Sequence, residues 1–254
     1  MSKKIVLPVI VLLVTLITIA YNSLANILPL NGLNTGEISD RYPVLFVPAG
    51  YVFSIWGLIY IALIAYSIYQ LLPAQWENPK LKRIALLYIL SSLANIAWLT
   101  LWHYEQITLS LAAMLVLLAS LIAIYVNLEI GRKAVSWQHK LLVQLPFSLY
   151  LGWVSVATIA NATTVLFVNN WSGWGISQVA WTVIMLVIGG VLAGLVQYLR
   201  RDLVYSLVFV WAFVGIVIKH SQTQAVMLAS SIIAVLILLY AVINRFIEPA
   251  TPAE

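Results

Sequence analysis

The side chains best suited to bind a ligand in this sequence are amides and aromatic rings that recur at helical spacing inside apolar stretches. Three stretches place such residues on one helical face: Thr15, Thr18, Asn22 and Asn26; Ser91, Asn95, Trp98 and Trp102; and Tyr150, Trp153, Ala157 and Asn161. A fourth stretch sets Phe53, Trp56 and Tyr60 behind Pro48 and Gly50. Because an amide that faces lipid would lack hydrogen-bond partners, these faces are expected to turn inward. Periodicity alone favours hydrogen bonds between helices, and the alternative is a cavity with aromatic walls and a few amide donors, typical of an apolar ligand site.

Ionisable and nucleophilic side chains offer little for catalysis. The chain has no cysteine, which excludes disulfides, thiolate metal sites and cysteine nucleophiles. All Asp, Glu, Lys and Arg residues, together with His103, His139 and His220, fall in loops or at predicted helix ends. No HExxH, GxSxG or paired-carboxylate pattern is present. We therefore predict no catalytic residue and no metal site, and the lack of charge at mid-membrane argues against a proton- or sodium-coupled pump.

The composition identifies the solvent of this chain as lipid. Of 254 residues, 63% are hydrophobic and 8% are charged, and the mean hydropathy is +1.01, whereas an ordinary soluble domain is about 25% charged. Such a chain has too little polar surface to cover a soluble fold. Membrane-spanning helices need roughly 20 apolar residues, and eight segments approach this length: residues 5–29, 46–73, 83–103, 106–128, 141–166, 177–199, 203–219 and 223–246. We predict an all-α integral membrane protein with eight transmembrane helices, of which 203–219 is the shortest.

The positions of Lys and Arg predict the orientation of these helices. With the N-terminus in the cytoplasm, the cytoplasmic side carries Lys3, Lys4, Lys80, Lys82, Arg83, Arg132, Lys133, Lys140, Arg200, Arg201 and Arg245. The other side carries only Arg41 and Lys219. Because cytoplasmic loops are enriched in positive charge, both termini are predicted to be cytoplasmic. The net charge of +5 therefore reports topology and contact with the lipid bilayer, and no nucleic acid is expected as a partner.

Three segments, in order along the chain, carry a family pattern. Residues 46–60 contain aromatic residues around a proline before the second helix: Phe46, Pro48, Tyr51, Phe53, Trp56 and Tyr60. Residues 93–102 surround Asn95 and Trp98, and residues 141–146 and 153–161 lie in the fifth helix. These segments resemble the translocator protein/tryptophan-rich sensory protein (TspO/MBR) family. The chain departs from the family at Phe46, Ala49, Tyr51 and Ser54, where the pattern has Trp, Pro, Trp and Gly.

The resemblance implies a TspO-like five-helix transmembrane bundle at residues 1–166, followed by an extension of three helices at residues 167–254. Members of the family bind tetrapyrroles such as protoporphyrin and haem, sterols and synthetic aromatic molecules inside the bundle. The resemblance and the inward faces together indicate these ligand-binding residues: Pro48, Phe53, Trp56, Asn95, Trp98, Trp153, Ala157 and Asn161. The loop after the first helix would cap the pocket with Glu37, Asp40 and Arg41. Arg41 would form either a pair with a porphyrin propionate or an ordinary loop salt bridge.

We therefore predict a tryptophan-rich sensory, TspO/MBR-like membrane protein that binds a tetrapyrrole or another planar apolar ligand in an aromatic pocket, for sensing, regulation or transport. It would require no cofactor, and protoporphyrin or haem would be its ligand. A small-molecule permease and a light-dependent porphyrin-degrading enzyme stay open as alternatives. The GxxxG motif from Gly190 to Gly194 permits close packing within the last three helices or in a homodimer. The expected location is the bacterial inner membrane.

Overall fold

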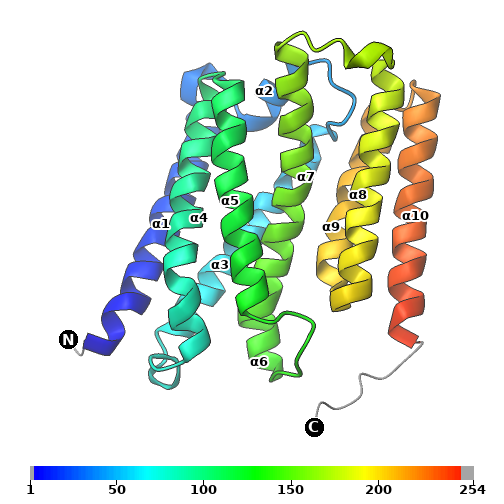
Figure 1. The fold of residues 1–254 in the computed structure, drawn as a ribbon. Helices are drawn as coiled ribbons and strands as arrows, with labels where there is room; N and C mark the ends of the chain where they lie inside the picture. Colours follow the sequence, from blue (N-terminus) through cyan, green and yellow to red (C-terminus); the bar gives the residue numbers. More distant parts are fainter. Residues whose placement is uncertain (1–2, 247–254) are drawn as a thin grey trace.

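The computed structural model describes residues 3–246, which fold into a bundle of helices lying side by side (Figure 1). Among these residues there are helices, turns and loops but no strand. The long helices are α1 (Val6–Ile27), α3 (Ile55–Gln70), α4 (Pro79–His103), α5 (Ile107–Asn127), α7 (Leu145–Val168), α8 (Gln178–Arg200), α9 (Leu203–Lys219) and α10 (Gln224–Phe246). Shorter pieces connect them: α2 (Thr35–Asp40), α6 (Trp137–His139), the π-helix η5 (Lys140–Gln144), and the 3₁₀ turns η1 (Lys3–Ile5), η2 (Leu30–Gly32), η3 (Gly50–Ser54), η4 (Pro73–Gln75) and η6 (Gly173–Gly175).

The predicted all-α membrane fold is confirmed. Within the described residues, seven helical segments are long and apolar enough to span a membrane, with η3 and α3 counted together as Gly50–Gln70 and α6, η5 and α7 as Trp137–Val168, and α9 is the shorter apolar helix. Its 17 residues span about 25 Å, against a hydrocarbon core of about 30 Å. The start of α1 and the end of α10 lie at the same end of the bundle, called here the inner end, and the opposite end is the outer end (Figure 1). The side chains of Lys3 and Arg245 fall outside what the structure describes.

Some helix boundaries differ from the prediction. Residues 46–73 do not form one helix, because the α-helix begins only at Ile55, after an irregular segment and the turn η3. Pro48 lacks an N–H and disfavours a helical conformation of the residue before it, so the helix does not include residues 46 and 47. The fifth predicted span begins in the π-helix η5. Pro146 has no N–H, so it cannot donate the α-helical hydrogen bond to the residue four positions earlier, and α7 begins only at Leu145. The predicted loop at residues 31–44 contains the helix α2.

The long helices form two groups that meet along α7 and α9. Helices α1, α3, α4, α5 and α7 form the five-helix bundle, and α8, α9 and α10 pack beside it (Figure 1). Contact between the groups runs mainly between α7 and α9. The division into residues 1–166 and 167–254 stays a prediction, and the last residue of α7 is Val168.

At the inner end, a buried carboxylate ties the three-helix group to α5. Asp202 caps α9, because its Oδ1 accepts a hydrogen bond from the backbone N–H of Tyr205 at 3.2 Å, and its Oδ2 accepts one from the Tyr125 hydroxyl at 2.9 Å. The Arg200 guanidinium lies over the Tyr125 ring, 5.6 Å from its centroid. Gly131, with φ of +74°, lies so close to Arg200 that a Cβ would overlap the Arg200 carbonyl. The two hydrogen bonds to Asp202 provide the partners that a buried carboxylate needs.

Toward the outer end, α9 holds the segment that precedes α3. The Ala49 N–H donates to the Gly215 carbonyl at 3.1 Å, and Trp211 Nε1 donates to the Val52 carbonyl at 3.1 Å. These bonds satisfy backbone groups that an irregular segment would otherwise leave unpaired in the membrane. The close approach requires a glycine on α9, because a Cβ at Gly215 would overlap Val52 Cγ2 and lie 2.9 Å from Pro48 Cβ.

The close contact between Gly215 and the segment before α3 predicts the effect of a single added methyl group. Gly215→Ala is expected to lower stability, since overpacking costs about 1–3 kcal/mol. Gly194→Ala is the matched control, because a Cβ at Gly194 meets nothing within 4 Å and Ala is the better helix former. Thermal unfolding of the purified protein in detergent measures both variants. Equal unfolding temperatures for the two variants would contradict the close packing of Gly215.

Candidate ligand pocket at the outer end

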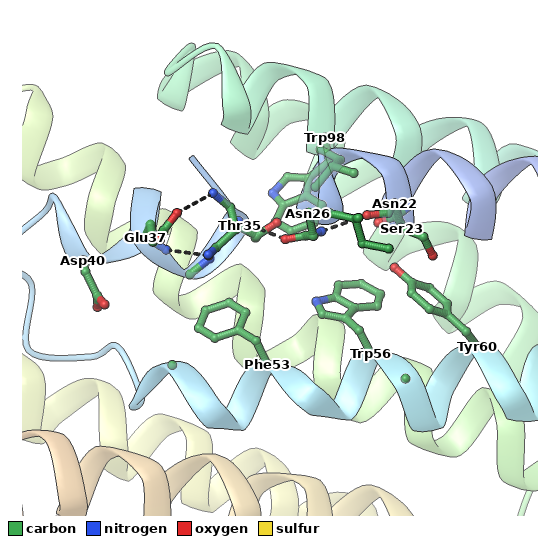
Figure 2. Close-up of a pocket in the computed structure, with 16 residues that line it drawn as sticks. Asn22, Ser23, Asn26, Thr35, Glu37, Asp40, Phe53, Trp56, Tyr60 and Trp98 are labelled. Atoms are coloured by element: carbon green, nitrogen blue, oxygen red, sulfur yellow. Dashed lines mark hydrogen bonds between the residues drawn. The ribbon is translucent and has the colours of Figure 1, made fainter. Parts of the chain in front are cut away.

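A cavity of about 560 Å³ lies between α1, α2, α3 and α4 toward the outer end of the five-helix bundle (Figure 2). Small-molecule sites are typically about 300–1,000 Å³ in volume. The lining residues are Asn22, Ser23, Asn26, Ile27, Asn34, Thr35, Gly36, Glu37, Asp40, Gly50, Phe53, Trp56, Gly57, Tyr60, Trp98 and Leu99. This set has an aromatic side on α3 and α4 and a polar side on α1 and α2.

The aromatic side contains a column of nearly parallel rings. Trp56 stacks on Tyr60 with centroids 5.6 Å apart and planes 25° apart, and on Trp98 with centroids 6.0 Å and planes 29° apart. Trp98 in turn stacks on Trp102 at 6.3 Å and 25°. The ring of Trp153 supports this column from behind, edge-on against Trp56 at 6.2 Å and 86°. The column therefore presents flat apolar faces in a fixed orientation, as offset-stacked rings do.

The polar side is built by carboxamides that bond to one another. Asn22 Nδ2 donates to Asn95 Oδ1 at 2.8 Å, which joins α1 to α4. Asn26 Nδ2 donates to the Asn22 carbonyl at 2.8 Å, and Asn26 Oδ1 accepts from the Thr35 N–H at 3.0 Å. Helix α2 is thereby fixed to the end of α1, with Asn22, Asn26 and Thr35 bordering the cavity (Figure 2).

Three buried N–H donors in this region have no acceptor among the described residues. They are Nδ2 of Asn95, Nε1 of Trp98 and Nε1 of Trp153. An unsatisfied buried donor costs about 1–3 kcal/mol. Trp98 lines the cavity with part of its ring, whereas its indole N–H is buried, as are the other two donors.

Helix α2 covers the cavity and is fastened to the end of α4. Asn34 Oδ1 accepts from the N–H of Glu37, and Glu37 Oε2 accepts from the N–H of Asn34, which together form a capping box. Trp102 Nε1 donates to the Thr35 carbonyl at 3.3 Å. The fully buried His103 pairs through Nε2 with the Thr35 hydroxyl at 3.1 Å.

Two neighbouring charges at the end of α2 pair with different parts of the molecule. Asp40 pairs with Lys219 at the end of α9, and Arg41 pairs with Glu105 in the loop between α4 and α5. The Tyr42 hydroxyl also donates to Glu105, at 3.1 Å. Burial, followed by the hydrogen bond and charge of Glu105, raises the pKa of Tyr42 to about 12. Arg41 is thus engaged outside the cavity, and the charged residues that line the cavity, Glu37 and Asp40, are both acidic.

The sequence matches one family model over nearly its whole length. The model is described as TSPO-like protein, and it matches residues 8–243. The chain belongs to the TSPO-like family. The match includes α8, α9 and most of α10, so it extends beyond the residues 1–166 that carry the motifs. Searches of curated proteins and of solved structures found no match.

The predicted site residues divide between the wall of the TSPO-like pocket and its surroundings. Those that line the pocket are Phe53, Trp56, Trp98, Glu37 and Asp40. Asn95 and Trp153 lie behind the wall, bonded to Asn22 and packed against Trp56 respectively. Both positions are suited to orienting the residues that line the pocket.

The other predicted residues lie farther from the pocket. Pro48 packs against Gly215 of α9. Asn161 Nδ2 donates to Ser110 Oγ at 3.0 Å, a bond between α7 and α5. Ala157, half-buried, lies one turn before Asn161 on α7. A role for these residues, or for Arg41, in ligand binding stays a prediction.

Several lining residues are not among the predicted site residues. Asn22, Asn26 and Tyr60 belong to the stripes described above, but periodicity alone does not place them together. Asn34 and Thr35 lie in a segment interpreted as a loop, although Asn followed three residues later by Glu is a capping-box signal. Within residues 3–246, His, Asp and Glu form no group of three that could hold a metal ion.

The bond between Asn22 and Asn95 predicts a coupled effect on stability. Asn22→Leu leaves Asn95 Oδ1 without its donor, and we expect a loss of about 0.6–1.7 kcal/mol, the range of hydrogen bonds between membrane helices. Asn95→Leu should cause a similar loss of stability. The double variant should lose less stability than the two single variants together, since both partners are then apolar and neither amide is left unpaired. Unfolding free energies from denaturant titration in micelles measure the cycle. Additive losses would show that the two amides are not coupled.

Proposed function

We propose that this TSPO-like membrane protein binds a planar, largely apolar ligand in the outer pocket, and that the ligand class is a tetrapyrrole such as protoporphyrin or haem. Binding would serve sensing, regulation or transport. The observation that carries the proposal is the column of parallel rings at Tyr60, Trp56 and Trp98. A flat conjugated molecule can extend this column by stacking, which adds about 0.5–1.5 kcal/mol per ring pair beyond the burial of apolar area. The membrane we propose is the bacterial inner membrane, and the charge bias of the loops predicts that both termini lie on its cytoplasmic side.

The polar groups of the pocket limit what else the ligand can carry. Asn22, Asn26 and Thr35 make one side of the pocket polar, so a ligand edge with hydrogen-bonding atoms is favoured there. Free carboxylates on the ligand are less favoured near the mouth, because Glu37 borders it, whereas the charge of Asp40, which also borders it, is offset by Lys219. Like charges at close range repel, although solvent and salt reduce the effect. The pocket thus suits the conjugated core of a tetrapyrrole better than ionised side groups.

Substitution of Trp56 tests the stacking wall. Trp56→Ala is expected to raise the dissociation constant for protoporphyrin about tenfold, which corresponds to about 1.4 kcal/mol. Trp153→Phe is the matched control, because this ring lies behind the wall, and the affinity should change by less than about twofold. Porphyrin absorbance reports binding, so that the loss of a tryptophan does not alter the signal. Equal affinities for both variants and the original protein would place binding elsewhere.

The charge argument is tested by comparing protoporphyrin with its uncharged dimethyl ester. The ester is expected to bind at least as tightly as the free acid. Glu37→Gln should raise the affinity for the acid by about two- to fivefold, since exposed charge interactions are worth about 0.2–1 kcal/mol. Gln at this position still completes the capping box, and the affinity for the ester should stay constant. Tighter binding of the acid than of the ester would contradict the assigned role of the acidic mouth.

A further inference from the structure

A second hollow lies on the side of the molecule, where the five-helix bundle meets the three-helix group. It has a volume of about 400 Å³, and its walls come from the start of α3, from α7 and from α9. Leu58 forms one wall, Leu207 and Trp211 form the other, and Leu149 and Val208 lie between them. None of these residues belongs to the outer pocket.

The hollow exists because α3 and α9 touch only near the outer end. Helix α9 packs on η3 and along α7, whereas α3 slants away from α9 toward the inner end (Figure 1). The floor is closed by tight packing of α7 on α9, since a Cβ at Gly152 would lie 3.1 Å from Val208 Cβ. This packing fixes α9 against α7, and the hollow beside them is a groove open to the membrane.

The chemistry of the groove selects hydrocarbon. Its lining is aliphatic and aromatic apart from the Ser54 hydroxyl at its outer end, and the Trp211 N–H is already bonded to the Val52 carbonyl. Leu58 is 55% exposed, Leu207 41% and Trp211 36%, so the groove continues the surface of membrane-spanning helices that faces lipid. A polar molecule would lose hydrogen bonds with water here and gain none from the walls.

We propose that this groove is a specific site for one acyl chain of a bilayer lipid. The chain fills the space between α3 and α9, where empty volume would forfeit van der Waals contacts on both walls. It also supports Trp211, whose ring packs edge-on against Tyr51 at 5.4 Å and whose N–H holds the Val52 carbonyl. This proposal stands independently of the ligand assigned to the outer pocket.

Photo-crosslinking tests the site on the full chain in lipid nanodiscs. The probe is a phosphatidylethanolamine with a diazirine in its acyl chain, and mass spectrometry maps the labelled residues. Labelling at Leu58 and Leu207 should exceed that at Leu238 about fivefold, the factor given by about 1 kcal/mol of preference for the groove. Leu238 on α10 is a matched reference, because it is also a leucine with 41% exposure. Equal labelling of the groove and Leu238 would overturn the proposal.

Variants in which a bulky side chain fills the groove provide a second, independent test. Leu207→Trp fills the groove and should reduce labelling at Leu58 about fivefold, whereas Leu238→Trp adds the same bulk on α10 and should leave it unchanged. Leu58→Trp, read at Leu207, repeats the test from the opposite wall should the first variant fail to fold. Undiminished labelling in the groove of a folded blocking variant would show ordinary surface lipid only and would overturn the proposal.

Discussion

A polar group inside the membrane must find its hydrogen-bond partner within the protein, and this constraint organises the five-helix bundle. Thr15 Oγ1 shares hydrogen bonds of 2.7 Å with Ser67 Oγ and with Tyr88 Oη, so that α1, α3 and α4 meet at one point. Nearer the outer end, Asn22 and Asn95 link α1 to α4 again. Transmembrane helices associate through close packing and through hydrogen bonds between helices. The polar pairs therefore help to set the helix register, and the register decides which aromatic rings face the pocket.

The same constraint makes the last three helices part of the pocket's support. Pro48 lies in the irregular segment before α3, and backbone groups of this segment bond to α9. Val47 belongs to this arrangement as well, since its carbonyl accepts from His220 Nε2 at 3.1 Å. Burial is the largest effect on the pKa of His220 and lowers it. The turn that carries Phe53 into the pocket is therefore anchored from outside the five-helix bundle, in keeping with a family match that covers both groups.

The sequence predicts the helices of this protein better than it predicts the site. Apolar length identifies eight helices, since the bilayer demands that length regardless of tertiary contacts. It misplaces the start of α3, because Pro48 acts only on the residues before it and the backbone of Ala49 and Val52 is bonded to α9, a contact that apolar length cannot reveal. For the site, helical spacing correctly groups Trp56 with Tyr60 and Asn22 with Asn26. It cannot show that Asn161 faces Ser110 rather than the pocket, because the choice of partner depends on helix packing.

The pocket is also a place where the constraint is incompletely met. Asn95, Trp98 and Trp153, in its wall and directly behind it, carry buried N–H groups without a partner among the described residues. Deeper in the bundle the Tyr66 hydroxyl is also unpaired, although Tyr88, against which its ring packs, is bonded to Thr15. Gln70 and Gln144 also carry unpaired amides, but they end α3 and η5 at the inner end, close to the membrane surface. Each unpaired donor lowers stability, and natural proteins concentrate such local violations at functional sites. Three of the unpaired groups thus gather at the outer pocket, where Trp56 packs against both Trp98 and Trp153 and the rings hold the wall in place.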